Sequence, residues 1–245
     1  MRFAAISDIH GNAPALEAVL DDIDHQHVDF AVNLGDAVSG PIAPARTADI
    51  LIAHDLPTIA GNHEQKLLTR PAEKLGKTDQ LAASQLTETH YEWLRILPPT
   101  LELAPDVFAC HGTPASNNVF WLDSPSKKGH MRLRPLEFIE AELNGVRHSL
   151  ILCGHTHTAR SVSLSTGQTV VNPGSVGLVA FGGAEGKARV SPGSPHARYA
   201  IIEQQRGQCT VSFRLVPYDW DEAARLAELN GAPDWAGWIR TGRAD

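Results

Sequence analysis

The stretch RFAAISDIHGN at residues 2–12 decides the expected fold. Its first part, RFAAIS, predicts a buried strand, DIHGN then forms a polar turn, and apolar residues from Leu16 to Ile23 recur at helical spacing. Asn12 is the expected N-cap of this helix, and Pro14 falls in its first turn, where proline is tolerated. The unit is therefore a strand, a polar turn and a helix.

The same unit recurs twice further along the chain. The strand FAVNL (30–34) leads through Gly35-Asp36 to the helix ARTADILIAH (45–54), and the strand PTIA (57–60) runs into Gly61-Asn62-His63-Glu64. This alternation predicts parallel strands, and functional groups on such sheets gather in the loops after the carboxyl ends of the strands. We therefore expect an α/β protein with its site at those ends.

The composition is that of a globular protein with a sizeable core. The chain has 245 residues, 42% of them hydrophobic and 20% charged, which suits a single domain spanning residues 1–245. Its net charge of −7 disfavours extended nucleic acids and anionic membranes as partners. Cys110, Cys153 and Cys209 lie in apolar stretches and are expected to be reduced, buried thiols, as in the cytoplasm. The sequence predicts neither an export signal nor a transmembrane helix.

The remaining segments differ in how clearly they are patterned. Residues 78–97 predict one long helix of imperfect period, and the part after residue 157 is rich in strand patterns. Residues 113–134 have no clear period and predict a lid or insertion in the form of a long ordered loop. The segment 182–195 is rich in Gly, Ser and Pro and predicts a flexible loop. The tail 218–245 is expected to be helical.

Metal-competent side chains occur in five polar turns, each directly after an apolar strand. These turns are Asp8-Ile9-His10, Gly35-Asp36, Gly61-Asn62-His63-Glu64, His111-Gly112 and Gly154-His155-Thr156-His157. Imidazole and carboxylate suit borderline and hard divalent ions, and the lack of thiolates in the set argues against a structural zinc cluster. In extended backbone, residues two apart project the same way, so each Asp-x-His or His-x-His pair can converge on one point.

Taken singly, each motif has an ordinary explanation. Gly35-Asp36 and Gly61-Asn62 are common turn sequences, and His111 alone could be a core histidine with a satisfied hydrogen bond. The two imidazoles of His155 and His157 are costlier to bury without partners. The joint placement of all five turns at strand ends of one sheet system favours a metal site over unrelated caps.

The full ordered set resembles the calcineurin-like metallophosphoesterase superfamily. The resemblance runs from residue 1 to about residue 215, and the turn Asn172-Pro173-Gly174-Ser175 is similar to the small bacterial and archaeal phosphodiesterase branch. It implies a four-layer αββα sandwich, in which two packed mixed β-sheets are flanked by helices. It also implies a dinuclear metal-dependent phosphoesterase.

The resemblance assigns a role to each matching residue. Asp8, His10 and His157 would hold one divalent ion, Asn62, His111 and His155 the other, and Asp36 would bridge the two. Asn62 and His63 would contact the phosphate. A hydroxide bridging the ions would attack phosphorus in line, with His63 as proton donor to the leaving oxygen. The nitrogen and oxygen ligands suit manganese, iron, nickel or zinc.

One departure from the family pattern concerns the partner of His63. Serine/threonine protein phosphatases follow the Gly-Asp pair with an aspartate and an arginine, whereas this chain reads Gly35-Asp36-Ala37-Val38-Ser39-Gly40. A protein phosphatase is therefore disfavoured, and the group that orients His63 stays open, with Glu64 as one candidate.

The sequence is compatible with several functions. We expect a phosphodiesterase acting on a small phosphate ester, with nucleotides among the candidates; a phosphomonoesterase or a dinucleoside polyphosphate hydrolase is the alternative. A non-catalytic scaffold that keeps the fold is disfavoured, because the related retromer scaffold lacks the acid histidine that His63 supplies here. A nuclease would rest on the basic residues Lys127, Lys128, Arg132 and Arg134, which predict a solvated loop instead.

Overall fold

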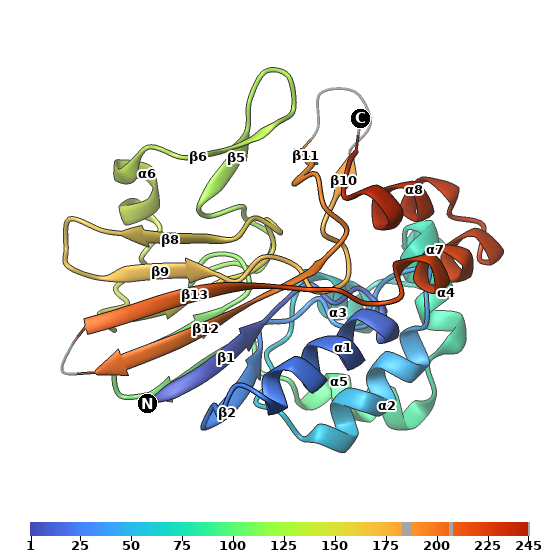
Figure 1. The fold of residues 1–245 in the computed structure, drawn as a ribbon, viewed down its shortest axis with the longest axis horizontal. Coiled ribbons are helices and arrows are strands. Elements are labelled where there is room, and N and C mark those ends of the chain that lie inside the picture. The colour runs from blue at the N-terminus through green and yellow to red at the C-terminus, as the bar shows by residue number, and fades with distance from the viewer. Residues whose placement is uncertain (183–187, 206–207, 245) are drawn as a thin grey trace.

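Two larger mixed β-sheets stack face to face in the computed structural model, which describes residues 1–182, 188–205 and 208–244 (Figure 1). The first sheet has the strand order β13-β12-β1-β2. Its strands are β1 (Arg2–Ile6), β2 (Phe30–Asn33), β12 (Ala197–Gln205) and β13 (Gln208–Val216). Strand β1 pairs parallel with β2 and antiparallel with β12.

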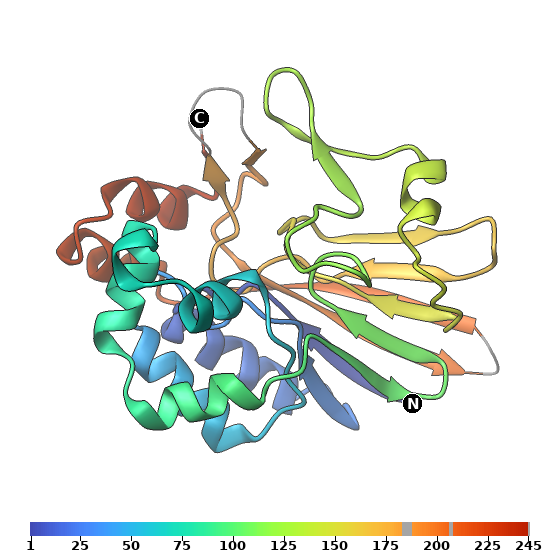
Figure 2. The ribbon, with the colours of Figure 1, turned by 180° about the vertical axis from the view of Figure 1, so that it is seen from behind.

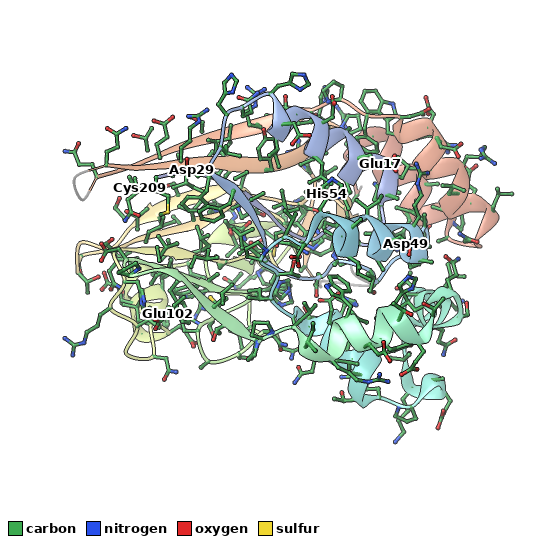
Figure 3. The ribbon with its side chains drawn as sticks, turned by 90° about the horizontal axis from the view of Figure 1, so that it is seen from below. Glu17, Asp29, Asp49, His54, Glu102 and Cys209 are labelled. Carbon is green, nitrogen blue, oxygen red and sulfur yellow. The ribbon has the colours of Figure 1, made fainter. Side chains whose placement is uncertain are left out.

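The second sheet has the order β3-β4-β7-β9-β8. It consists of β3 (Thr100–Ala104), β4 (Val107–Cys110), β7 (Leu150–Leu152), β8 (Arg160–Ser163) and β9 (Thr169–Asn172). Strands β4, β7 and β9 are parallel to one another. The parallel pairing predicted for the first two strands of the chain is seen between β1 and β2. Figure 3 views the stack from the side, with Cys209 on β13 of the first sheet and Glu102 on β3 of the second.

Helices cover the outer faces of both sheets. Those beside the first sheet are α1 (Ala13–Asp24), α2 (Pro44–His54), α3 (Asn62–Thr69), α4 (Lys77–Gln85) and α5 (Glu88–Ile96), with a short 3₁₀ turn η1 (Ala72–Lys74). Helix α6 (Leu136–Ala141) lies beside the second sheet, and α7 (Trp220–Leu229) and α8 (Pro233–Thr241) form the tail. Figure 2 shows α3 to α5 from behind.

The alternation of apolar residues along the strands explains the layers. In β1, Phe3 and Ala5 face the core between the sheets, whereas Ala4 and Ile6 face the helices. In β7, Leu150 and Leu152 join the core between the sheets, and Ile151 packs on the outer side with the α6 residue Ile139. Because both faces of these strands are covered, three apolar clusters separate four layers. The expected αββα sandwich is confirmed.

Local sequence signals fix the ends of the helices. The Asn12 side chain accepts a hydrogen bond from Ala15 N at 3.2 Å and caps α1, as predicted. The single helix expected over residues 78–97 is wrong, because Leu86 and Thr87 are extended and Thr87 caps a new helix, α5. Asn62, which was expected in a turn, is the first residue of helix α3.

Two small hairpins project from the same end of the molecule (Figures 1 and 2). One, β5 (Asp123–Pro125) with β6 (Met131–Leu133), lies inside the segment expected to be one long loop. The other pairs β10 (Phe181–Gly182) with β11 (Arg189–Val190), so part of the loop predicted over 182–195 is strand, while 183–187 lie outside the described residues. Among the described residues, no helix is long and apolar enough to cross a membrane.

Candidate metal centre

The five polar turns come together in space. Four of them follow β1, β2, β4 and β7, whereas Gly61 to Glu64 follow the segment 57–60, which forms a single parallel bridge from Thr58 to Asn33 and not the predicted strand. Backbone hydrogen bonds join the turns directly: Asp8 N donates to Gly35 O at 3.0 Å, and Gly154 N donates to His111 O at 2.7 Å. His155 N also donates to the Asp8 carboxylate at 3.1 Å. The turns of the two sheets therefore form one site, as the strand pattern predicted.

The backbone of these turns is left-handed and not extended. Five of the predicted ligands have φ between 51° and 66°, a region that costs energy for residues other than glycine: Asp8, His10, Asp36, His155 and His157. The expectation that alternate residues of an extended segment would converge is therefore wrong in its geometry. The side chains converge because each turn reverses the chain within a few residues.

The first group of ligand atoms comes from Asp8, His10 and His157, all buried. His10 Nε2 lies 3.1 Å from His157 Nε2, and His157 Nε2 lies 3.2 Å from Asp8 Oδ1. Their atoms fall within 4.8 Å of one another, which suits a single ion. Asp8 Oδ1 is buried without a hydrogen-bond partner, a state that costs free energy unless a cation takes its place.

The second group combines Asp36, His111 and His155. Asn62 Oδ1 adds a fourth acceptor, 3.2 Å from His111 Nε2, 3.1 Å from Asp36 Oδ2 and 3.0 Å from His155 Nδ1. Turning this amide by 180° would place its NH₂ against these acceptors and its oxygen 2.7 Å from Lys66 Nζ. The inward oxygen is the orientation that suits a bound cation.

Asp36 lies between the two groups. Its Oδ2 is 3.1 Å from His111 Nε2 in the second group and 4.0 Å from His10 Nε2 in the first. Its Oδ1 accepts a hydrogen bond from His63 N at 2.9 Å, which fixes the carboxylate plane. The carboxylate is therefore in reach of both groups.

Main-chain carbonyls set the tautomers of three imidazoles. The Nδ1 atoms of His10, His111 and His157 lie 2.8, 2.7 and 2.6 Å from carbonyl oxygens of Ser39, Leu34 and Leu178 respectively. With Nδ1–H donating to a carbonyl, Nε2 is the atom left to face a cation, as in metal sites whose ligand histidines are oriented by a second partner. Two such Nε2 atoms facing each other at 3.1 Å suit a cation between them. The donor set fits divalent metals.

Electrostatics at the site agree with this fit. Burial lowers the pKa of His10 and His155 to about 3, so both rings are neutral at pH 7. Burial also raises the pKa of Asp8, but His157 more than offsets it and the pKa falls to about 2. Burial lowers the pKa of His111, yet the Asp36 carboxylate raises it to about 9. A positive charge is thus strongly favoured beside Asp36.

His63 lies next to the first group and is oriented by Asp79. His63 Nδ1 is 2.7 Å from Asp79 Oδ1 and 2.8 Å from Ser39 Oγ, and Ser39 Oγ also hydrogen-bonds to Asp79. Burial lowers the pKa of His63, but the carboxylates of Asp36 and Asp79 raise it above its usual value. The suggestion that Glu64 orients His63 is wrong.

Glu64 instead ties two turns together. Its buried carboxylate accepts hydrogen bonds from Gly61 N and Asp36 N at 2.8 Å and from Ala37 N at 2.9 Å. The turn after β2 and the start of α3 therefore move as one unit. This arrangement places His63 and Asn62 against Asp36.

A cavity of about 330 Å³ opens over both groups. Polar ligand residues and His63 form its floor, and Lys66 lies on one side, with Nζ 3.5 Å from His63 Nε2. Its apolar lining comes from Phe120, Leu178, Phe181, Trp235 and Trp238. The sequence did not point to Asp79, Lys66 or the two tryptophans as parts of the site, because none of them lies in a recognisable motif.

A four-layer sandwich with paired Asp/His groups at one edge of its sheets is an arrangement that suits a metal-dependent hydrolase. Residues 1–194 match the calcineurin-like phosphoesterase superfamily domain, and the chain belongs to this superfamily. It is therefore a metal-dependent phosphoesterase.

Known proteins resemble the chain over nearly its whole length. An uncharacterized protein of Methanocaldococcus jannaschii is 24% identical, over 96% of this chain and 95% of the relative. A metallophosphoesterase from Sphaerobacter thermophilus superimposes with a TM-score of 0.75 at 23% identity, over 99% of this chain and 100% of that one. A hypothetical protein from Pyrococcus horikoshii OT3 gives 0.76 at 20% identity, over 100% and 99%. These structural likenesses show the shared fold.

Proposed function

We propose that the chain is a phosphodiesterase whose site holds two divalent ions. Asp8, His10 and His157 hold one ion, Asn62, His111 and His155 hold the other, and Asp36 binds both. The observation that carries this proposal is the first group: Nε2 of His10 lies 3.1 Å from Nε2 of His157, each ring has its Nδ1 held by a main-chain carbonyl, and Asp8 Oδ1 beside them has no hydrogen-bond partner. A cation among these atoms satisfies all three and leaves the histidine hydrogen bonds to the main chain intact.

When bound, such ions supply a nucleophile from water near neutral pH and neutralise charge on the phosphoryl oxygens. Binding of the phosphate and donation of the proton fall to side chains of the protein. Asn62 and His63 contact the phosphate at the cavity floor. Since Nδ1 of His63 is engaged by Asp79, Nε2 is the atom that donates a proton to the leaving oxygen. Asp79 and Ser39 keep that ring oriented.

The apolar lining of the cavity favours a diester over a monoester. Beyond the two proposed ions, Lys66 is the one permanent cation among the described residues that line it, and much of the remaining wall is apolar. A diester carries a second organic group that can occupy this wall, whereas a monoester carries only one. A dinucleoside polyphosphate would bring further phosphates, for which the described lining offers no second Lys or Arg. Both remain as the alternative substrates to test.

The tail belongs to the same functional unit, so we propose one domain over residues 1–245. Asn230 Nδ2 donates to Pro41 O at 2.9 Å, which ties the α7–α8 connection to the segment after Asp36. Helix α8 also supplies Trp235 and Trp238 to the cavity wall. Residues 113–134 contribute in the same way, because the loop before β5 carries Phe120.

The decisive test is metal analysis followed by ester hydrolysis. Protein stripped of metal is loaded in turn with manganese, iron, nickel or zinc, and rates are compared on bis(p-nitrophenyl) phosphate and p-nitrophenyl phosphate. We expect about two ions per chain, and a higher kcat/KM for the diester. Protein that binds metal but hydrolyses no phosphate ester would contradict the enzyme, and preference for the monoester would favour the alternative.

Variants of two histidines separate the acid role from general damage. His63→Ala should keep its metal and lose about a hundred- to ten-thousandfold in its rate on alkyl esters. The loss is largest there because poor leaving groups depend on the proton that His63 donates. The control is His54→Ala on α2, whose exposed side chain lies outside the cavity lining (Figure 3). Equal losses of His63→Ala on nitrophenyl and alkyl esters would count against the acid.

A further inference from the structure

Four aromatic rings form a collar around the mouth of the metal cavity. Phe120, Phe181, Trp235 and Trp238 all line it, and each is only half-buried. They come from three separate parts of the chain: the loop before β5, strand β10 and helix α8. Half-buried aromatic rings next to a polar floor offer flat apolar surface to a ligand.

The rings lie directly against the proposed ligands and acid. The Trp235 ring centroid is 5.9 Å from that of His10, which is itself 5.3 Å from His63. Phe181 packs edge-on to His157 at 4.8 Å. A group attached to the phosphate on the His63 side therefore lies within reach of Trp235 and Phe181.

Phe120 closes the opposite side of the collar. Its ring centroid is 4.6 Å from that of His155, in the second group. The collar thus spans both metal groups, with apolar surface on two sides of the phosphate position. A substrate whose only features were a phosphate and a small alkyl group would leave this surface unused.

Helix α8 is built to present its tryptophans to the cavity. Its residues Ala236 and Ile239 are buried in the cluster that joins α8 to α7, and Trp235 packs partly against that cluster while it also lines the cavity. Trp235 lies close to Gly40, where an added Cβ would come within 3.4 Å of its ring. Trp238 lies 3.7 Å from the position of an added Cβ at Gly182. Contact with the cluster therefore orients Trp235 toward the cavity.

We infer that the substrate is a nucleotide ester whose base stacks on this aromatic collar. The inference rests on the proposed function and adds the chemical class of the group attached to phosphorus. A nucleobase offers a planar π-face that stacks on indole and phenyl rings whatever its sequence identity. Lys66 and the metal groups take the phosphate, and the collar takes the base.

The experiment compares two ligands that present the same phosphate and differ only in the base. Binding of adenosine 5′-monophosphate and of ribose 5-phosphate to manganese-loaded protein is measured by calorimetry, which needs no turnover. We expect the adenosine ligand to bind at least about tenfold more tightly, as stacking contributions of this kind predict. Trp235→Ala and Trp238→Ala should each reduce that ratio severalfold and leave ribose 5-phosphate unchanged.

Two further variants guard against structural explanations. Trp235→Phe keeps an aromatic face and should keep most of the ratio. Trp220→Phe changes an indole of α7 that packs near Tyr218 and His196, outside the cavity lining. Trp220 packs against the same cluster as Trp235, and because the phenyl ring keeps that contact, both affinities should stay unchanged. If Trp235→Ala weakened both ligands equally, the tryptophan would be structural and the inference would be overturned.

The outcomes distinguish this inference from the proposed function. Protein that hydrolyses bis(p-nitrophenyl) phosphate but binds the two ligands equally is a phosphodiesterase without a base site, which overturns the inference alone. Protein that prefers the adenosine ligand through Trp235 yet hydrolyses no ester has the base site without the activity. That result would support the collar and contradict the enzyme.

Discussion

Replacing Gly61 with alanine tests whether the position of Asp36 controls the metal centre. A Cβ on Gly61 would lie 2.2 Å from Asp36 Oδ1 and 2.4 Å from Asp36 N, whereas ordinary contact begins near 3.4 Å. The backbone φ of Gly61 is −82°, so alanine suits the local conformation and the clash is the only obstacle. Relieving the clash requires a shift of roughly 1 Å between the turn after β2 and the start of α3.

That displacement falls on the residue expected to bind both ions. A misplacement of about 1 Å in a catalytic site is worth about a hundredfold in rate. It also strains the Glu64 hydrogen bonds to Gly61 N and Asp36 N, which hold the two turns together. We therefore expect Gly61→Ala to lose about a hundredfold in kcat/KM on bis(p-nitrophenyl) phosphate and to bind metal more weakly.

The assay is metal content by elemental analysis after dialysis, together with the rate and the thermal midpoint. Gly237→Ala is the matched control: it lies within α8 and a Cβ there meets nothing within 4 Å. This control should keep metal and activity and gain about 0.5–1 kcal/mol in stability, because alanine favours helix over glycine. A folded Gly61→Ala protein with full metal content and activity within about threefold of the parent would refute the reasoning.

Three further predictions test other parts of the structure. Asp79→Asn keeps the shape of the His63 partner but removes its charge, so alkyl esters should be hydrolysed about ten- to a hundredfold more slowly. The rate on nitrophenyl esters should fall less, and the metal content should not change. Stripping the metal with a chelator should abolish hydrolysis and lower the thermal midpoint by about 5–10 °C, with both restored by manganese, because Asp8 and Asp36 are then buried without cations. At Asp22, burial raises the pKa, but hydrogen bonds from Arg214 and Tyr199 outweigh it and lower the pKa below 3.8. The ionised carboxylate therefore stabilises the fold above that pH. Asp22→Asn should lower the thermal midpoint by about 2–4 °C at pH 7, a value reduced because the ion pair is partly exposed. The difference in midpoint between variant and parent should shrink as the pH falls below about 4.

Most residues of the candidate metal centre could be predicted because they lie directly after an apolar strand; Asn62 instead follows a segment that forms only a single β-bridge. Strand periodicity and polar turns are local signals, and the parallel sheet brings them together. The left-handed backbone at Asp8 and His155 was not foreseen, since such conformations are held by surrounding contacts and not by the residue type. Geometry inferred from extended strands was accordingly wrong, although the predicted side chains do lie close together.

Residues outside the motifs were missed for a different reason. Asp79 reaches His63 only because α4 packs against α3, and nothing near Asp79 in the sequence indicates that contact. Trp235 and Trp238 have the same spacing as core residues of an amphipathic helix, so sequence alone cannot tell a cavity wall from a packing face. Tertiary packing determines where Asp79, Trp235 and Trp238 lie, so local sequence patterns could not predict their contacts.

The pairing of β1 with β12 has a consequence for how the protein matures. Arg2 to Ala5 pair with Glu203 to Ala200, and Ser175 Oγ donates to Asp8 O at 2.8 Å, so the first turn of the site is fastened by segments made late in synthesis. Contacts of such long sequence separation are slow to form, because loop closure must precede them. A growing chain will therefore carry Asp8 and His10 unanchored until Ser175 and β12 have been made. Competence to take up metal should then come at once, after these segments have paired, and not in stages.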